Sequence, residues 1–193
     1  MDILVLDADG VVNPLRFSDF SAFGLSQEMA AVFFAGPFKQ CLVGADTKRA
    51  LDAFAAEHGL TLDLAGLFAH WHEDQKDTHA QVVGTVRRLR EHGVHAILAT
   101  NQEPYRLVYM RERMGYRDIF DHIFCSSEIG TTKPDPRFFE TIQAKLPVGL
   151  VRFIDDSQAN VDAARAYGWE GHCFAGDEAV SAQLRAWWPE LTH

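Results

Sequence analysis

The chain has few cysteines, no basic leader and no long hydrophobic run. Its three cysteines are widely spaced among 193 residues and form no Cys-x-x-Cys pair. Neither a disulfide framework nor a zinc knuckle is therefore expected, and reduced thiols in a cytoplasmic protein are the simpler interpretation. The apolar stretch 29–38 is too short to span a bilayer and is broken by Gly36-Pro37. These absences predict neither a signal peptide nor a transmembrane helix, and hence no membrane partner.

Positive charge is also scarce. The formal net charge is -9, from 27 acidic and 18 basic residues. Nucleic acid is not an expected partner, because binding it generally requires basic side chains that neutralise phosphates. A local cationic site can still bind an anionic substrate. The length suits one domain, or a core domain with a small inserted lobe. The oligomeric state stays open, with a monomer slightly favoured.

Short apolar runs alternate with helical segments along most of the chain. The runs at 3–6, 96–99 and 150–154 predict strands buried on both faces, and weaker runs lie at 123–125 and 172–174. Strands that alternate with helices predict an α/β fold, with a Rossmann-like parallel sheet covered by helices on both faces. Asp135 and Ser157 are expected to cap two of these helices.

The region from 14 to 78 breaks this alternation. It contains no convincing buried strand, and the segments 48–58 and 62–75 have the pattern of helices. We therefore expect a small inserted helical cap at 14–78, and an α/β core built from 1–13 and 79–193.

Two pairs of acids directly follow predicted strands. Asp7 and Asp9 come after the first predicted strand, and Asp155 and Asp156 come after the predicted strand 150–154. Ligands of parallel sheets bind outside the carboxyl ends of the strands. If the two loops converge, charges about 4 Å apart repel by roughly 4 kcal/mol at an effective dielectric of about 20, which protonation or a cation must offset. Hard oxygen ligands favour Mg²⁺. Read more simply, the first pair marks a turn and the second the start of a helix.

Three further residues suit phosphate chemistry. Thr100 and Asn101 follow the run 96–99, where a hydroxyl and backbone N–H groups can hold phosphate oxygens. Lys133 precedes Pro134, which favours an extended backbone at the lysine. A lysine in this setting can stabilise charge on a phosphoryl group. Taken separately, Thr100-Asn101 is more simply a turn or a helix cap, and most lysines are solvated surface residues.

The order and spacing of these clusters resemble the haloacid dehalogenase-like hydrolase superfamily. The branch concerned is subfamily IA-like, in which a helical cap follows the first strand. The resemblance covers nearly the whole chain and rests on the segments LDADGVV at 6–12, ATN at 99–101, GTTKPDPRFF at 130–139 and FIDDSQANVDAARAYG at 153–168.

This resemblance implies a role for each catalytic residue. Asp7 is expected to be the nucleophile that forms an aspartyl-phosphate, and Asp9 to be the general acid/base. Thr100 and the backbone of Asn101 are expected to bind phosphate, and Lys133 to stabilise the anion.

The same resemblance implies Mg²⁺ held by Asp7, the backbone carbonyl of Asp9 and Asp156, with Asp155 close behind. The expected activity is a Mg²⁺-dependent phosphatase for a small phosphorylated metabolite, for example a sugar phosphate. A phosphomutase on the same scaffold and a catalytically silent binding module remain alternatives. A dehalogenase is a more distant one, because the family's dehalogenases lack an acid at the position of Asp9 and need no metal.

Predictions can also be made for Asn13 and for several aromatic residues. Asn13 stands where many family members have Asp, and its place beside the cap linker concerns substrate recognition more than mechanism. Four phenylalanines are expected to pack inside the cap, although some of them can line the roof of the site: Phe33, Phe34, Phe38 and Phe54. Trp71 is expected to point inward. Trp187 and Trp188 are expected to dock on the core, with a partner surface as the alternative.

Overall fold

The sheet is parallel throughout. In the computed structural model, which describes residues 1–191, five strands form one sheet in the order β3-β2-β1-β4-β5. The strands are β1 (Asp2–Leu6), β2 (His95–Thr100), β3 (His122–Cys125), β4 (Leu150–Asp155) and β5 (Glu170–Cys173). Each of the five apolar runs singled out in the sequence lies on one of these strands. The predicted α/β class is confirmed.

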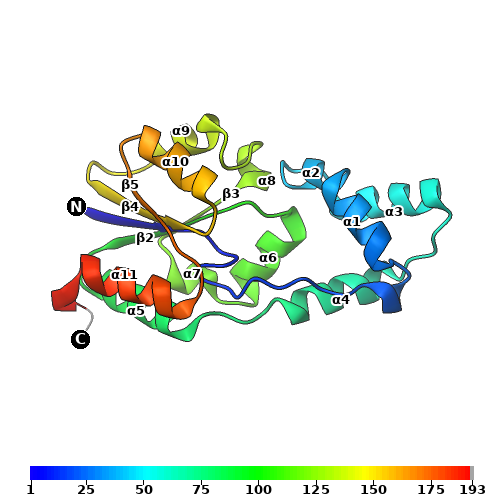
Figure 1. Cartoon of the computed structure of the whole chain (residues 1–193), viewed down its shortest axis with the longest axis horizontal. Helices are drawn as coiled ribbons and strands as arrows, with labels where there is room; N and C mark the ends of the chain where they lie inside the picture. Colours follow the sequence, from blue (N-terminus) through cyan, green and yellow to red (C-terminus); the bar gives the residue numbers. More distant parts are fainter. Residues whose placement is uncertain (192–193) are drawn as a thin grey trace.

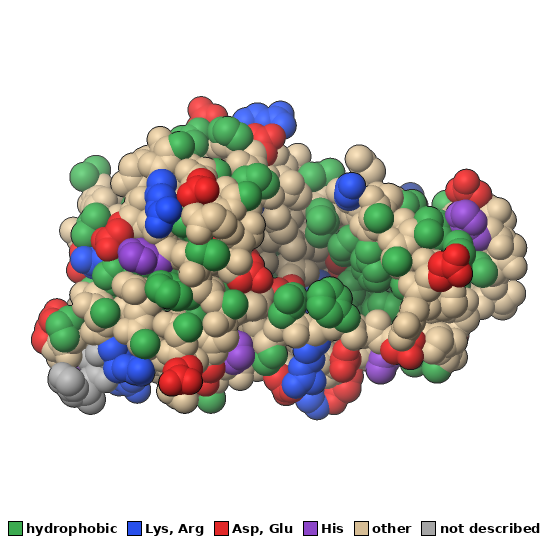
Figure 2. All heavy atoms as spheres, in the orientation of Figure 1, with side chains coloured by type: hydrophobic (Ala, Val, Ile, Leu, Met, Phe, Trp, Pro, Cys, Tyr) green, Lys and Arg blue, Asp and Glu red, His purple; other side chains and the backbone are tan. Residues whose placement is uncertain are grey.

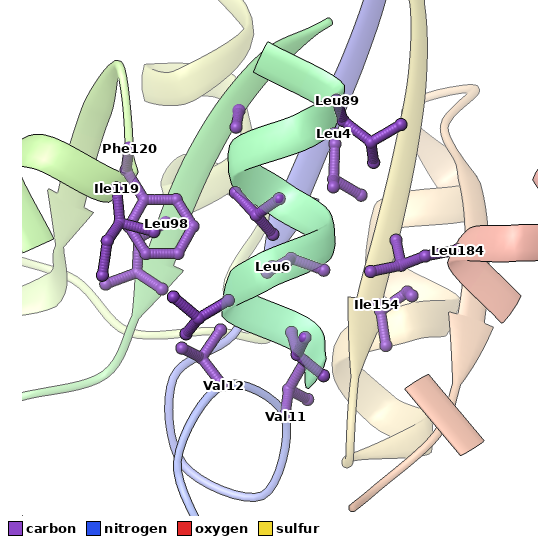
Figure 3. Packing of buried hydrophobic residues seen from close by; sticks show 14 of the residues in the cluster. Leu4, Leu6, Val11, Val12, Leu89, Leu98, Ile119, Phe120, Ile154 and Leu184 are labelled. Atoms are coloured by element: carbon purple, nitrogen blue, oxygen red, sulfur yellow. The ribbon is translucent and has the colours of Figure 1, made fainter. Parts of the chain in front are cut away.

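Helices cover both faces of this sheet (Figure 1). On one face, Leu4 and Leu6 of β1 pack against α5 (Ala80–Glu91) and α11 (Asp177–Trp187). Figure 3 shows these leucines beside Leu89 of α5, with Leu184 of α11 close to β4. On the other face, the alternate residues of β1 pack against α9 (Pro136–Gln143) and α10 (Gln158–Ala166). A strand with apolar side chains on both faces must lie in the centre of the core.

Four further elements complete the core lobe: α6 (Pro104–Glu112), α7 (Tyr116–Ile119), α8 (Ser126–Ile129) and η2 (Pro189–Leu191). Between β1 and α5 the chain forms a helical lobe, which lies at one end of the molecule (Figure 1). Its elements are η1 (Ser21–Phe23), α1 (Gln27–Ala35), α2 (Phe38–Cys41), α3 (Thr47–His58) and α4 (Leu64–Asp74).

The helical lobe has an apolar cluster of its own. Phe33, Leu51, Phe54 and Trp71 are all buried in it. The expected inward orientation of Trp71 is therefore confirmed. The boundaries of an inserted cap at 14 and 78 stay a prediction.

Asn13 ties together the two chain segments that run between the lobes. Its Nδ2 donates to the backbone carbonyl of Asp77 at 3.0 Å, and the Tyr116 hydroxyl donates to its Oδ1 at 2.6 Å. The His79 N–H donates to the Val12 carbonyl at 2.8 Å beside it. Asn13 is only 1% exposed, so this polar side chain is satisfied within the protein.

The two ends of the described chain lie together, on the side of the sheet away from the helical lobe (Figure 1). The Trp188 indole N–H donates to the Asp2 carboxylate at 3.1 Å, and the ring is buried against the core. The expected docking of Trp188 is confirmed. Within residues 1–191, no helix is long and apolar enough to cross a membrane.

Candidate active site

The candidate site lies where three neighbouring strands end. Asp7 follows β1, Thr100 is the last residue of β2, and Asp155 is the last residue of β4. β1 lies between β2 and β4, with Leu6 opposite Leu98 and Ile154. The carboxyl ends of the three strands therefore meet at one edge of the sheet, where ligands of such sheets bind.

Lys133 joins two of the carboxylates at this edge. Its Nζ lies 2.8 Å from Asp7 Oδ1 and 2.5 Å from Asp155 Oδ2. Its side chain is only 1% exposed. Burial lowers the pKa of the Lys133 ammonium, but attraction by Asp7 and Asp155 outweighs burial and leaves that pKa above its ordinary value. Lys133 therefore stays charged beside Asp7.

Asp155 uses both carboxylate oxygens within the protein. Its Oδ2 accepts from Lys133, and its Oδ1 accepts from the Ser157 N–H at 2.9 Å and from Asn160 Nδ2 at 2.8 Å. Asp155 thus supports the N-terminus of α10. Ser157 occupies the N-cap position of this helix as expected, but its side chain makes no capping hydrogen bond. The Asp135 side chain does accept from the Arg137 N–H and caps α9 as expected.

Asn101 fixes the backbone of Lys133 with its side chain. Its Nδ2 donates to the Lys133 carbonyl at 3.0 Å, and its Oδ1 accepts from the Lys133 N–H at 2.9 Å. The sequence did not reveal this role, in which the Asn101 side chain holds Lys133 from a loop that is distant in sequence. Thr100 is only 1% exposed, and phosphate binding by Thr100 and by the Asn101 backbone stays a prediction.

Asp9 lies beside two residues that sequence reasoning missed. Gln102 Nε2 donates to Asp9 Oδ2 at 2.5 Å. Burial raises the pKa of Asp9, while the positive charge of Arg106 and the Gln102 hydrogen bond oppose that rise. A carboxyl group with a raised pKa is suited to carry a proton to a leaving group. The signal in the sequence is weak, because Gln102 and Arg106 simply follow the predicted Thr100-Asn101 turn.

Arg106 links this edge to the helical lobe. It is 1% exposed, and its Nη2 donates to the Gln75 carbonyl at 2.5 Å. Its Nε and Nη1 have no hydrogen-bond partner within residues 1–191. Other contacts between the lobes also use α6 and the turn before it. The Thr47 hydroxyl donates to Glu103 at 2.5 Å, and His72 stacks on Tyr109 with ring centroids 4.7 Å apart.

The acids at the sheet edge are close enough to share a cation. One carboxylate oxygen from each of Asp7, Asp155 and Asp156 lies within 4.8 Å of the other two. Burial raises the pKa of Asp7 to about 7, with repulsion by Asp155 adding to the rise and attraction by Lys133 opposing it. Burial also raises the pKa of Asp156. Crowded buried carboxylates of this kind are stabilised by a cation, and an all-oxygen donor set fits Mg²⁺.

Gly10 allows the two acidic loops to approach each other. Its φ is +82°, a conformation that L side chains rarely adopt. A Cβ at this position would lie 2.5 Å from Asp156 Oδ2. Its carbonyl accepts from the Gly176 N–H at 2.7 Å, which fixes the loop. The close approach of Asp156 therefore depends on the missing side chain.

Most of the chain matches the model of one protein family. Residues 30–168 match the model of the haloacid dehalogenase-like hydrolases. The chain belongs to this family. The model covers the helical lobe from Ala30 onward, the Thr100-Asn101 turn, Lys133 and the Asp155-Asp156 pair. The predicted superfamily is confirmed, and the cap subfamily stays a prediction.

This hydrolase is also similar to individual proteins. A sesquiterpene phosphatase of Aspergillus oryzae is 32% identical over 108 residues, which are 55% of this chain and 55% of the relative. A haloacid dehalogenase-like hydrolase domain-containing protein 3 of Bos taurus is 32% identical over 104 residues, which are 52% of this chain and 41% of that protein. The alignments thus span about half or less of the curated relatives.

A solved structure shares the fold of this hydrolase over nearly its full length. A family enzyme of Bacteroides thetaiotaomicron in complex with magnesium has a TM-score of 0.82 at 21% identity, over 96% of this chain and 98% of that one. At this identity the likeness concerns the fold alone.

Proposed function

We propose that this hydrolase is a Mg²⁺-dependent phosphatase that cleaves small organic phosphate monoesters through an aspartyl-phosphate on Asp7. The observation that carries the proposal is the contact of Asp7 with the buried, charged Lys133, with Asp156 beside them at the same sheet edge. A carboxylate paired with a fixed cation is preorganised to attack a phosphorus atom and to tolerate the charge that develops there.

The reaction proceeds in two displacements. An oxygen of Asp7 attacks phosphorus, the ester P–O bond breaks, and Asp9 gives its proton to the leaving alcohol oxygen. Asp9 then takes a proton from water, which attacks the same phosphorus. The P–O bond to Asp7 breaks, so inorganic phosphate leaves and the Asp7 carboxylate is restored. The raised pKa of Asp9 suits both proton transfers.

The remaining residues hold charge and geometry. Asp7, the Asp9 carbonyl and Asp156 would hold Mg²⁺, which when bound supplies positive charge that draws the phosphate against the acids. The hydrogen bonds of Asp155 favour a supporting role, in which it orients Lys133. Thr100 and the Asn101 backbone would contact phosphate oxygens. The name of the Aspergillus oryzae relative adds support, since it describes a phosphatase.

The decisive experiment compares the natural protein with D7N, using p-nitrophenyl phosphate and Mg²⁺. Asn keeps the size of the side chain but is a poor nucleophile, so turnover should disappear while circular dichroism stays unchanged. Mass spectrometry of the natural protein, quenched during turnover, should detect one added phosphoryl group, and D7N should lack it. Turnover retained by a folded D7N contradicts the nucleophile.

Product analysis separates the other activities considered from the sequence. Release of inorganic phosphate supports hydrolysis. Transfer of the phosphoryl group to another hydroxyl of the substrate would assign a phosphomutase. No turnover across a broad panel of esters, together with no Mg²⁺ binding in a titration, would assign a silent binding module. Chloride release from a haloacid would assign a dehalogenase.

A further inference from the structure

The helical lobe and the linker that enters it form an open cavity of about 660 Å³. This volume falls within the range of small-molecule sites, roughly 300–1,000 Å³. Five aromatic residues line it, and we call it the aromatic cavity: Phe17, Phe20, Phe34, Phe38 and Trp71. Figure 2 shows a hollow between the two lobes, with hydrophobic side chains gathered on the side of the helical lobe.

The aromatic wall is already assembled. The ring centroids of Phe34 and Phe38 lie 4.9 Å apart, and those of Phe34 and Trp71 lie 5.6 Å apart. Phe20 packs on Trp71 with centroids 5.6 Å apart. Rings that hold one another in place lose little conformational freedom when a ligand binds.

Three of the five polar residues in the cavity wall, Arg16, Ser18 and Gln75, bond to other parts of the protein. Arg16 donates to Asp77 at 2.6 Å and to the Asp74 carbonyl at 3.3 Å. The Ser18 hydroxyl donates to the Asp74 carboxylate at 2.6 Å, and the Gln75 amide donates to the Arg16 carbonyl at 3.3 Å. A polyhydroxylated ligand would compete with these contacts, and hydroxyl groups left unpaired in an apolar cavity are costly.

Phe17 marks the open part of the cavity. Its side chain is 90% exposed, although its neighbours in the wall include buried rings. A large apolar side chain kept in water gains free energy when an apolar group covers it. The wall therefore favours a ligand with apolar surface.

The aromatic cavity is connected to the candidate active site through one buried side chain. Gln75 lines the cavity, and its carbonyl accepts from Arg106. The positive charge of Arg106 acts in turn on Asp9, the proposed proton donor to the leaving group. The alcohol part of a substrate attacked at Asp7 would leave past Asp9, toward the helical lobe.

We propose that the aromatic cavity binds the leaving group of the substrate, and that this leaving group is an apolar alcohol, as in an alkyl or other hydrocarbon-chain phosphate monoester. The inference rests on the proposed phosphatase function and narrows its substrate class. It disfavours the sugar phosphate given above as an example of a small phosphorylated metabolite.

The test measures kcat/KM with Mg²⁺ for a series of linear alkyl phosphates from methyl to decyl phosphate, and for glucose 6-phosphate. Each added methylene that is buried should raise kcat/KM about threefold to fourfold until the cavity is filled. Glucose 6-phosphate should fall well below octyl phosphate. Equal kcat/KM along the series, with ordinary turnover of methyl phosphate, overturns the substrate class and leaves the phosphatase function standing. Failure of every ester overturns the phosphatase function itself.

Two adjacent positions of α1 give a matched pair of variants. Ala31 lines the aromatic cavity, whereas its neighbour Val32 is 47% exposed and is not part of the wall. A31W should lower the octyl-to-methyl ratio of kcat/KM at least tenfold, and V32W should leave the ratio unchanged. An unchanged ratio in a folded A31W contradicts the proposal.

The exposed Phe17 provides a test that does not depend on the packing of α1. F17S removes apolar surface without opening the core, so the protein should fold normally. It should flatten the dependence of kcat/KM on alkyl chain length by several-fold. A dependence as steep as that of the natural protein counts against the cavity as the binding site.

Discussion

The sheet edge and the aromatic cavity differ in how they achieve specificity. At the edge, every polar side-chain atom of Lys133 and Asp155 has a partner, and the partners of Lys133 come from loops far apart in sequence. In the aromatic cavity, the side chains of Arg16 and Ser18 bond to acids outside the wall, and apolar rings remain for a ligand. The first arrangement fixes the positions of a few charged atoms, and the second offers shape and apolar surface.

This difference separates two properties of the protein. The chemistry depends on a charged network that tolerates little change, because an unpaired charge in a buried network is costly. The choice of substrate depends on packing, which can vary by small steps, because one methylene changes the binding free energy by about 0.8 kcal/mol. Substitutions in the two regions should therefore fail in different ways.

The largest expected effect lies in the charged network. K133M leaves Asp7 and Asp155 without their shared cation, and removing one partner of a buried ion pair costs about 3–5 kcal/mol. We expect kcat to fall by roughly 10²–10³-fold and the unfolding midpoint in urea to fall as well. K76M is the control, because Lys76 pairs with Glu73 on the exposed surface. A K133M protein as stable as K76M would show that the network tolerates change after all.

The next test concerns the approach of the acidic loops. G10A introduces a Cβ that would meet Asp156 Oδ2, so Mg²⁺ affinity measured by calorimetry should fall about 10–100-fold.

G168A separates displacement of the carboxylate from backbone strain. Gly168 has a φ of +81°, close to that of Gly10, and no heavy atom lies within 4 Å of the point that a Cβ would occupy there. It should lose about 1–2 kcal/mol of stability and keep its Mg²⁺ affinity. Equal affinity in the two variants would contradict the role of Gly10.

A third test loosens the two chain segments that run between the lobes. N13A removes the hydrogen bonds to the Asp77 carbonyl and the Tyr116 hydroxyl, and both partners would stay buried. We expect a loss of about 1–3 kcal/mol in the free energy of unfolding and faster proteolysis in the linkers. Y116F removes only one of these bonds and should lose less. The comparison fails if Y116F is the less stable variant.

The smallest effect is a dependence on pH in the contact between the lobes. Burial lowers the pKa of His72 to about 4, with Arg106 and Lys48 adding to the shift. Between about pH 4 and pH 6.5, the unfolded chain therefore binds more protons than the folded chain. The contribution of neutral His72 to the free energy of unfolding is complete above this range and is lost as the pH falls through it. Because the side chain is only partly buried, we expect on the order of 1 kcal/mol.

H72F preserves an aromatic ring next to Tyr109 but cannot be protonated. Its thermal midpoint should change less between about pH 7 and pH 5 than that of the natural protein. Parallel curves for the two proteins would assign the pH dependence to other groups.

The sequence predicted the sheet edge well for a physical reason. A strand buried on both faces is a continuous apolar run, so the position where it ends is visible, and acids at that position can be located without coordinates. Asp7 and Asp155 were found in this way. The same reasoning gave the five strands and the helices 48–58 and 62–75, within a few residues of α3 and α4.

Contacts that depend on distant loops were not predictable. Asn101 was expected to act through its backbone, but its side chain holds Lys133, and no local pattern records such a pairing. Gln102 and Arg106 look like ordinary polar residues at the start of a helix. Ser157 occupies the N-cap position of α10, but its side chain accepts no capping hydrogen bond, and its N–H donates to Asp155 instead. Some cap aromatics were expected to line the site, but the sequence did not show which ones, because Phe34 and Phe38 have the same pattern as core residues.

The contact between Trp188 and Asp2 has a practical consequence. It holds both ends of the described chain at the amino-terminal edge of β1, whereas substrate chemistry is proposed at the opposite, carboxyl-terminal edge. An affinity tag or a fluorescent protein fused at either end would therefore project away from the entrance used by a phosphate ester. Surface immobilisation through such a tag should leave that entrance open to solution.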